Sequence, residues 1–421
     1  MLLALLAGTV VVVQGLRAGP PVMTGVMPGS FTGYAFDACD APSQRQMDAW
    51  LEHSPYWAVG IYIAGENRAC AQQPHLDAEW VATQAARGWR LLPLSVGRQA
   101  PCSQGHWSKI DPSPAGGYAA ARDQGRDEAT DAVAAAGDLG IARGSTLWLD
   151  VEAFDISRTP CRDATLTYVS SWTRALRDRG YGSGFYSSAS SGIRMLEQAR
   201  VGAGGRYDLP RQIWVGDWNQ RHDTGSAYLS RDGWSGGRVH QYTGTHRETY
   251  GGVTLEIDSS FMDVGRGTVA PPDRTPCATP RGYPTLRAGD RTPGVVALQC
   301  LLQHSHPPWQ DTSGEYTSAT VQAVTVFQRS HGLRPTGVTD RPTWVALLSQ
   351  GSRPLLKYGS GSDAVRRLQR ALGATQGAAI SVTGVFEENT RQAVQRYQRT
   401  HGLPATGVVT TDVWRVLQTG R

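Results

Sequence analysis

The chain has 421 residues, with 41 Lys and Arg residues against 36 Asp and Glu residues and a formal net charge of +5. This length exceeds a single typical core, so we expect two or three domains. The mild charge excess favours an anionic polymer or surface as a partner, but the positive side chains are too scattered to predict nucleic-acid binding. Lysine occurs only at Lys109 and Lys357.

Residues 1–30 contain an apolar run from Leu2 to Val13, followed by Gly, Arg and Pro. The run is too short for a comfortable membrane span and has the length of a signal-peptide core. No basic residue precedes it, so either the true start lies upstream or the segment is an unusual secretion signal. We expect an export segment here and no membrane span elsewhere.

Residues 31–265 alternate between strand-like and helical patterns. The strand-like runs lie at 32–38, 57–65, 89–97, 145–153, 182–188, 211–219, 237–243 and 254–263. Helical patterns at 77–88, 128–140 and 164–180 each end in a Gly suited to a helix C-cap. This α/β alternation predicts a (β/α) TIM-like barrel whose last helices are short or missing. An open doubly wound sheet is the alternative fold.

The fourth run, "STLWLDVEAFD", places two acids in a sequence that otherwise resembles a buried strand. Trp148, Asp150 and Glu152 share one face of such a strand, and aliphatic side chains occupy the other. The two acids are two residues apart, or roughly 6.6 Å between Cα atoms. That spacing allows one acid to donate a proton while the other stays ionised. The alternative is that both acids pair with Arg or Lys on neighbouring strands.

Further acids fall near the carboxyl ends of the predicted strands, where barrels of this class assemble their active sites. They are Asp37, Asp150, Glu152, Asp217 and Asp258, accompanied by the aromatic residues Tyr62, Trp148, Tyr186, Trp218 and Tyr242. Such a rim suits the binding of sugar rings and the protonation of a glycosidic oxygen. Several carboxylates cannot all stay charged in one pocket, so we expect a raised pKa, with Glu152 as the central candidate.

Other catalytic arrangements find little support in the sequence. The Ser-rich turn after the fifth strand (Ser187, Ser188, Ser190, Ser191) lacks a G-x-S-x-G elbow. A zinc site would have to draw on scattered histidines, and no H-x-H or HExxH motif is present. These histidines are His75, His106, His222, His240 and His246. We therefore expect no metal and no cofactor.

Residues 283–350 and 354–421 are two copies of one unit, after a Pro- and Thr-rich linker at 266–282 that suits a semi-rigid spacer. "VFQRSHGLRPTGV" (326–338) matches "RYQRTHGLPATGV" (396–408) at an offset of 70. The apolar residues fall at helical spacing, which predicts a small all-α bundle of three helices in each copy. His331 and His401 occupy equivalent positions, where we expect a structural role.

Both copies resemble the peptidoglycan-binding repeats found at the ends of many secreted cell-wall hydrolases. The resemblance rests on V-x-x-L-Q-x-x-L, then T-x-x-A-V-x-x-[FY]-Q-x-x-x-G-L-x-x-T-G-V, then a Trp. It implies binding to peptidoglycan. The Asp that often precedes the glycines is replaced here by Ser313, Thr336, Thr383 and Thr406. A role as spacers or protein-docking modules is the alternative for one or both copies.

The barrel region carries a second resemblance. "GYAFDAC", "LWLDVEAF", "GFYSS", "IWVGDWN", "VHQYT" and "LEIDSSF" are similar, in order and strand position, to motifs of the muramidases of glycoside hydrolase family 25. "ACDAPS", "GIYIAGENRACAQ", "LLPLSVGRQAPC" and "GFYSSASSGIR" more closely resemble a secreted, mainly actinobacterial family of glycoside-hydrolase-like domains. The resemblance to the glycoside-hydrolase-like family extends from Phe31 to Val264.

The resemblance implies roles for individual residues. Glu152 would be the general acid, and Asp150 would stabilise the N-acetyl group of the substrate in a substrate-assisted cleavage. Asp37 and Asp258 would hold the geometry and tune the pKa of Glu152. We expect substrate contacts from Asp217, Trp218, Tyr62, Trp148, Tyr186, Gln241 and Tyr242.

The six cysteines form no CxxC motif and no zinc spacing, so disulfides are expected, in agreement with export. Cys300 stands where the second copy has Arg370, and we expect it to bond to Cys277 in the linker. Three pairings are possible for the other four cysteines. We favour Cys70 with Cys102 and Cys39 with Cys161.

Together these patterns predict a secreted, cell-wall-associated monomer that hydrolyses β-1,4 bonds of peptidoglycan while two repeats anchor it to the polymer. Anchoring helps because it raises the effective concentration of the cleft at an insoluble substrate. A non-catalytic wall-binding or wall-organising protein is the first alternative. The second is a glycosidase acting on another polysaccharide.

Overall fold

The computed structural model describes residues 24–421 except 275, 278–281, 306–310 and 377–379. Most of the predicted export segment therefore lies outside the described residues. Residues 24–30 pack against the barrel, since Met27 is buried and its carbonyl accepts a hydrogen bond of 2.8 Å from the Thr146 N–H. Within the described ranges, no helix is long and apolar enough to cross a membrane.

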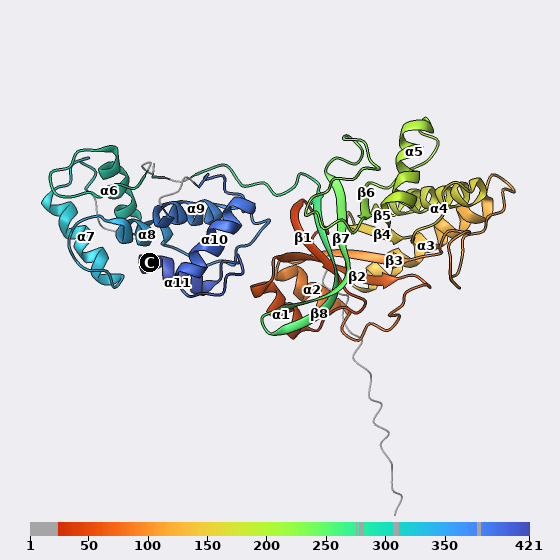
Figure 1. The fold of residues 1–421 in the computed structure, drawn as a ribbon, viewed down its shortest axis with the longest axis horizontal. Coiled ribbons are helices and arrows are strands. Elements are labelled where there is room, and N and C mark those ends of the chain that lie inside the picture. The colour runs from red at the N-terminus through yellow and green to blue at the C-terminus, as the bar shows by residue number, and fades with distance from the viewer. Residues whose placement is uncertain (1–23, 275, 278–281, 306–310, 377–379) are drawn as a thin grey trace, which may run out of the picture.

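Eight strands close into a barrel in sequence order, which confirms the predicted fold over an open sheet (Figure 1). They are β1 (Phe31–Asp37), β2 (Tyr56–Ala64), β3 (Arg90–Val96), β4 (Thr146–Asp150), β5 (Gly182–Ser188), β6 (Gln212–Gly216), β7 (Gly237–Tyr250) and β8 (Val253–Val264). Neighbouring strands run parallel from β1 through β7. The last strand runs antiparallel to both β7 and β1.

A tight hairpin turn reverses the direction of β8. Gly251 and Gly252 connect it to β7 with φ values of 58° and 75°, the left-handed conformations that a two-residue hairpin loop of type I′ needs. The reversal brings the middle of β8 to the rim where the parallel strands end. Asp258 consequently pairs with Asp37, the last residue of β1.

Helices cover the outside of the first five strands. They are α1 (Gln44–His53), α2 (Ala78–Ala86), α3 (Ala119–Asp138), α4 (Thr159–Asp178), the π-helical turn η1 (Ala189–Ile193) and α5 (Arg194–Gly202). The third helix begins well before the predicted residue 128. Within residues 217–268, all of which the structure describes, no helix forms. The prediction of missing last helices is therefore confirmed.

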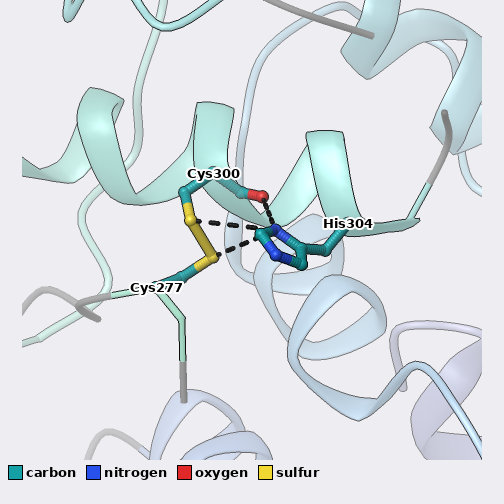
Figure 2. Close-up of side chains that lie close together, drawn as sticks. All are labelled: Cys277, Cys300 and His304. Atoms are coloured by element: carbon teal, nitrogen blue, oxygen red, sulfur yellow. Dashed lines mark hydrogen bonds between the residues drawn. A yellow bond between two sulfur atoms is a disulfide. The ribbon is translucent and has the colours of Figure 1, made fainter. Parts of the chain in front are cut away.

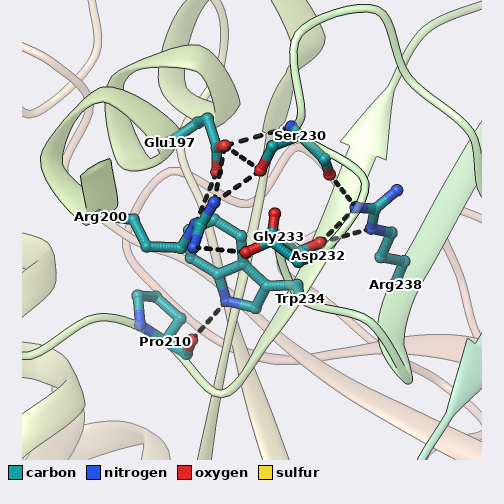
Figure 3. Close-up of polar contacts among 8 residues, drawn as sticks. All are labelled: Glu197, Arg200, Pro210, Ser230, Asp232, Gly233, Trp234 and Arg238. Carbon is teal, nitrogen blue, oxygen red and sulfur yellow. Dashed lines mark hydrogen bonds and ion pairs between the residues drawn. The ribbon is translucent and has the colours of Figure 1, made fainter.

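A polar cluster holds the long loop that connects β6 to β7 in place of a helix (Figure 3). Glu197 on α5 accepts hydrogen bonds from Arg200 at 2.9 Å and from the Ser230 hydroxyl at 2.5 Å. These bonds, led by the one from Arg200, lower the pKa of Glu197 to about 2. Arg238 on β7 donates to the carbonyls of Ser230 and Gly233, each at 2.7 Å. The loop is thus fixed through its backbone.

The disulfides correct one prediction and confirm another. Cys39 is bonded to Cys70, and Cys102 to Cys161, so the favoured pairing of Cys70 with Cys102 and Cys39 with Cys161 is wrong. Each observed bond links segments that follow two adjacent strands, β1 with β2 and β3 with β4. A Cys39–Cys161 bond would have had to link segments that follow the non-adjacent strands β1 and β4. Cys277 is bonded to Cys300, as predicted.

Each C-terminal copy folds into three helices, as predicted. The first repeat contains α6 (Pro293–Ser305), α7 (Ser318–Ser330) and α8 (Arg341–Ser349), and the second contains α9 (Asp363–Gln376), α10 (Glu388–Thr400) and α11 (Thr411–Gln418). Figure 1 shows the second repeat between the first repeat and the barrel. The linker passes along the second repeat, where Arg366 donates to the Pro271 carbonyl at 2.6 Å.

Candidate active site

Four carboxyl groups meet at the rim of the barrel, on the floor of a cleft. Asp37 ends β1, Asp258 lies beside it on β8, Asp150 ends β4 and Glu152 follows two residues later. All four line a small cavity of about 60 Å³. Above it a cleft of about 690 Å³ opens to solvent. Strands far apart in the sequence therefore bring the four predicted catalytic residues together.

Three polar side chains organise this floor. The Tyr62 hydroxyl donates to Asp37 at 2.8 Å. The Gln241 amide donates to Asp258 at 3.1 Å and to Asp37 at 3.4 Å, so it bridges the two acids. Tyr186 in turn donates to the Gln241 carbonyl oxygen at 3.0 Å, which fixes the orientation of the amide. These three residues were predicted as substrate contacts, and the structure places them in the same cavity.

Asp150 is buried, and one of its carboxyl oxygens lacks a hydrogen-bond partner within the described ranges. Its side chain is 6% exposed, and its Oδ1 has no hydrogen-bond partner among the residues that the structure describes. Burial, followed by the negative charges of Glu152 and Asp37, raises the pKa of Asp150 well above its usual value. A buried acceptor without a partner costs free energy, so its retention marks the position as a candidate for function.

The other three acids also have raised pKa values. Burial and the charge of Asp258 raise the pKa of Asp37 to about 7, although hydrogen bonds from Tyr62 and Gln241 oppose the change. Desolvation is the main cause for Asp258 and for Glu152, and Asp258 adds to the rise at Glu152. Glu152 is the most accessible of the four, at the mouth of the cavity. It therefore combines a raised pKa with access to a ligand.

Gln99, which the sequence analysis missed, holds the backbone that carries two of these acids. Its amide donates to the Asp150 carbonyl at 3.1 Å, and its carbonyl oxygen accepts from the Glu152 N–H at 2.7 Å. Gln99 is 1% exposed and lies in the loop after β3, which the Cys102–Cys161 bond ties to the first turn of α4. A polar residue just past a strand end at the rim was the available signal.

Three of the predicted substrate contacts lie outside the cleft. Trp148 is fully buried inside the barrel, with its ring 5.6 Å from that of Trp214, so it belongs to the core. Tyr242 points outward and its ring lies 4.4 Å from His222. Asp217 accepts a hydrogen bond from Asn219 at 2.9 Å and does not line the cleft.

Trp218 remains close to the floor. It is 64% exposed, and its indole N–H donates to the Gln241 carbonyl oxygen at 2.9 Å. A second exposed tryptophan, Trp107, lines the cleft from the loop after β3 and was missed by the sequence analysis. Two exposed indoles beside a polar floor offer flat apolar surfaces on which a ring can lie.

The described histidines do not gather into a metal site. His240 contacts the carbonyls of Asp223 and Asp217 at 2.6 and 2.8 Å, and His246 contacts Glu248 at 3.0 Å. One group of potential ligands, Cys277, Cys300 and His304, has its donor atoms within 4.8 Å of one another (Figure 2). Its two sulfurs are joined in a disulfide, so neither offers the thiolate that binds metals.

Comparison with known protein families agrees with this geometry. Residues 48–262, more than half of the 421 residues, match the family described as "Rv2525c-like, glycoside hydrolase-like domain". The chain belongs to this family. Beyond the glycoside hydrolase-like barrel, residues 291–347 and 361–417 match the family "Putative peptidoglycan binding domain". The resemblance of the barrel to a family of glycoside-hydrolase-like domains is thereby confirmed, as is that of the two C-terminal copies to peptidoglycan-binding repeats.

Individual relatives are distant. A Bacillus licheniformis protein named N-acetylmuramoyl-L-alanine amidase CwlL is 30% identical over 32% of this chain and 45% of its own length. The chain thus spans less than half of this curated relative. The Mycobacterium tuberculosis Tat-secreted protein Rv2525c, solved with L-tartrate, is 12% identical and covers 56% of this chain and 97% of its own, with a TM-score of 0.36. The Clostridium perfringens spore cortex lytic enzyme SleM is 12% identical over 55% of this chain and 67% of its own, with a TM-score of 0.38.

Proposed function

We propose that the glycoside hydrolase-like barrel cleaves a β-1,4 bond of peptidoglycan next to an N-acetylated sugar, in the manner of a muramidase. The observation that carries the proposal is the group of four carboxyls with raised pKa values on the floor of an open cleft. Paired acids of this kind perform glycoside hydrolysis. Two peptidoglycan-binding domains in the same chain supply the substrate class. The disulfides favour a secreted protein acting at the cell wall.

In the proposed reaction, Glu152 donates its proton to the glycosidic oxygen as the bond from that oxygen to the anomeric carbon breaks. The acetamido carbonyl oxygen of the substrate attacks the same carbon from the opposite face. Asp150 Oδ1 accepts the acetamido N–H and gains the partner that it lacks among the described residues. Water then attacks the anomeric carbon, the bond from that carbon to the acetamido oxygen breaks, and Glu152 takes a proton from the water, so the configuration is retained.

Product analysis of purified peptidoglycan tests this proposal. Wild-type protein should release soluble fragments with new reducing ends, and Glu152→Gln should reduce that release by about 100-fold or more, as expected for loss of a general acid. Glu256→Gln is the matched control, because Glu256 lines the same cleft but not the small cavity that the four acids share. It should retain activity.

The same experiment addresses the main alternative. If the folded wild type binds walls of several chemotypes and releases no fragments, the hydrolase proposal fails and a non-catalytic wall-binding protein is favoured. Release of fragments with new amino termini and no new reducing ends would instead indicate cleavage of the peptide. Equal release by wild type and Glu152→Gln would exclude Glu152 as the acid.

A further inference from the structure

The second repeat places one of the two lysines of the chain inside an interface with the barrel. Lys357 is 0% exposed, and its ammonium group donates to the backbone carbonyls of Leu51 at 2.6 Å, Ser54 at 3.3 Å and Tyr56 at 2.7 Å. Leu51 lies in the last turn of α1 and Ser54 is its C-cap, where a cation is favoured by the helix dipole. All three donors of the ammonium group are therefore used.

Aromatic rings surround this polar contact. The Lys357 nitrogen lies 5.6 Å from the Trp57 ring centroid and 5.2 Å from that of Trp89. Beside it, the Tyr358 ring packs edge-on against Tyr34 at 5.2 Å and Phe261 at 5.7 Å. The contact thus combines a charge satisfied by carbonyls with an apolar cluster, which resembles a permanent interface more than a chance encounter.

The docked surface joins the C-terminal end of α1 to the outward faces of the neighbouring strands β1 and β8. Tyr34 on β1 and Phe261 on β8 are paired neighbours whose side chains point outward, while Ala35 and Met262 face the barrel interior. In a (β/α) barrel, helices normally cover such outward aromatic residues. Here Tyr34 is 6% and Phe261 8% exposed, and Tyr358 of the second repeat packs against both.

The first repeat differs at the same positions. Arg287 and Ala288 stand 70 residues before Lys357 and Tyr358, and both are exposed. Gly359 packs so closely against β1 that a Cβ atom there would lie 2.5 Å from the Phe31 ring, whereas its equivalent Gly289 has open space. The residues that make the contact therefore belong to the second copy alone of these two repeats.

We infer that the second repeat is a docked wall of the barrel, held by Lys357 and Tyr358, and that the two repeats have separate roles. The second covers the outward faces of β8 and β1, and it folds and moves as one body with the barrel. The first repeat makes no such contact with the barrel through the equivalent residues Arg287 and Ala288, which are exposed. This assignment does not depend on whether the cleft is catalytic.

Exchanging residues between the repeats tests the inference in the full chain. The double substitution Lys357→Arg and Tyr358→Ala installs the residues that the first repeat already carries, so the repeat fold accommodates them. A planar guanidinium cannot replace an ammonium among three converging carbonyls. We expect the melting temperature of the barrel to fall by about 5 °C or more in calorimetry. We also expect a larger radius of gyration in X-ray scattering and faster hydrogen exchange in β1.

The reciprocal change, Arg287→Lys and Ala288→Tyr, is the matched control and should leave all three measurements unchanged. Tyr358→Ala alone should give a smaller effect of the same sign. A double variant with the melting temperature, scattering and exchange of the wild type would overturn the inference. Loss of the α9–α11 fold in the double variant, with the barrel as stable as in the wild type, would overturn it too.

Discussion

Two buried ionisable groups in this molecule differ in whether the surrounding residues supply hydrogen-bond partners. Lys357, between the second repeat and the barrel, has three carbonyl acceptors and two flanking indoles. Asp150, on the floor of the cleft, has an Oδ1 with no partner in the described part of the chain and is surrounded by other acids. Both side chains are nearly inaccessible to solvent.

This difference in hydrogen-bond partners distinguishes a group that stabilises the fold from a group that is a candidate for function. A buried charge whose hydrogen-bonding capacity is filled holds two segments together, and removing it leaves the partners unpaired. A buried carboxyl that lacks partners destabilises the fold and is retained for what it does to a ligand. The interface and the cleft can therefore be distinguished by how substitution changes stability relative to activity.

The largest effect that would sharpen this comparison is expected from Asp150→Asn. Peptidoglycan cleavage should fall about 100- to 1,000-fold, because a positioned electrostatic contact to the reacting sugar is lost. The free energy of unfolding should rise by about 0.5–2 kcal/mol, because a neutral amide avoids the burial of a carboxylate and its repulsion by Glu152 and Asp37. Denaturant titration and product release measure the two quantities. If the Asp150→Asn protein were less stable than the wild type, the contrast between Asp150 and Lys357 would be wrong.

An intermediate effect concerns pH and Asp37. The folded state holds a proton on this group up to a pKa of about 7, whereas the usual value is 3.8. Between these pH values the folded state binds more protons than the unfolded chain, so stability falls as pH rises and levels off above pH 7. The stability advantage of Asp37→Asn over wild type should therefore grow from about pH 4 to about pH 7.

The smallest effect is expected from Gln99, which acts on the acids only through their backbone. Gln99→Met removes both hydrogen bonds and should reduce cleavage about tenfold by displacing Glu152. It should also shift the alkaline limb of the pH–rate profile, which reports the deprotonation of Glu152 as the general acid and which a purely structural role would leave in place. Gln99→Glu retains the acceptor for the Glu152 N–H, so its cleavage rate should lie between those of the wild type and Gln99→Met. An unchanged profile in Gln99→Met would remove Gln99 from the site.

Periodicity and strand-end rules predicted the barrel, the two repeats and the gathering of four acids. The direction of β8 was not predicted, because alternation of side chains is the same in a parallel and an antiparallel strand. The signal was the Gly251–Gly252 pair between two strand patterns, which favours a hairpin. Asp258 still reached the rim because the reversed strand carries it there.

Other differences come from which way a side chain faces and which loops are adjacent. Gln241 and Tyr242 are consecutive, yet one lies in the cleft and the other packs outside the barrel. Their assignment as neighbouring substrate contacts did not take into account that consecutive side chains of a strand point to opposite faces. The docking of the second repeat was not predictable from either unit, since it depends on two surfaces distant in the sequence.

Because the chain has only two lysines, chemical labelling of amines can report whether the second repeat is docked on the barrel. Of the two lysines, Lys109 is partly accessible in a loop at the rim, and Lys357 is sealed in the interface. A reagent that acylates amines would therefore modify Lys109 in the native protein and reach Lys357 only when the second repeat leaves the barrel. Labelling of Lys357 would thus report separation of the second repeat from the barrel in the wild-type chain. Labelling of Lys109 would serve as the internal standard.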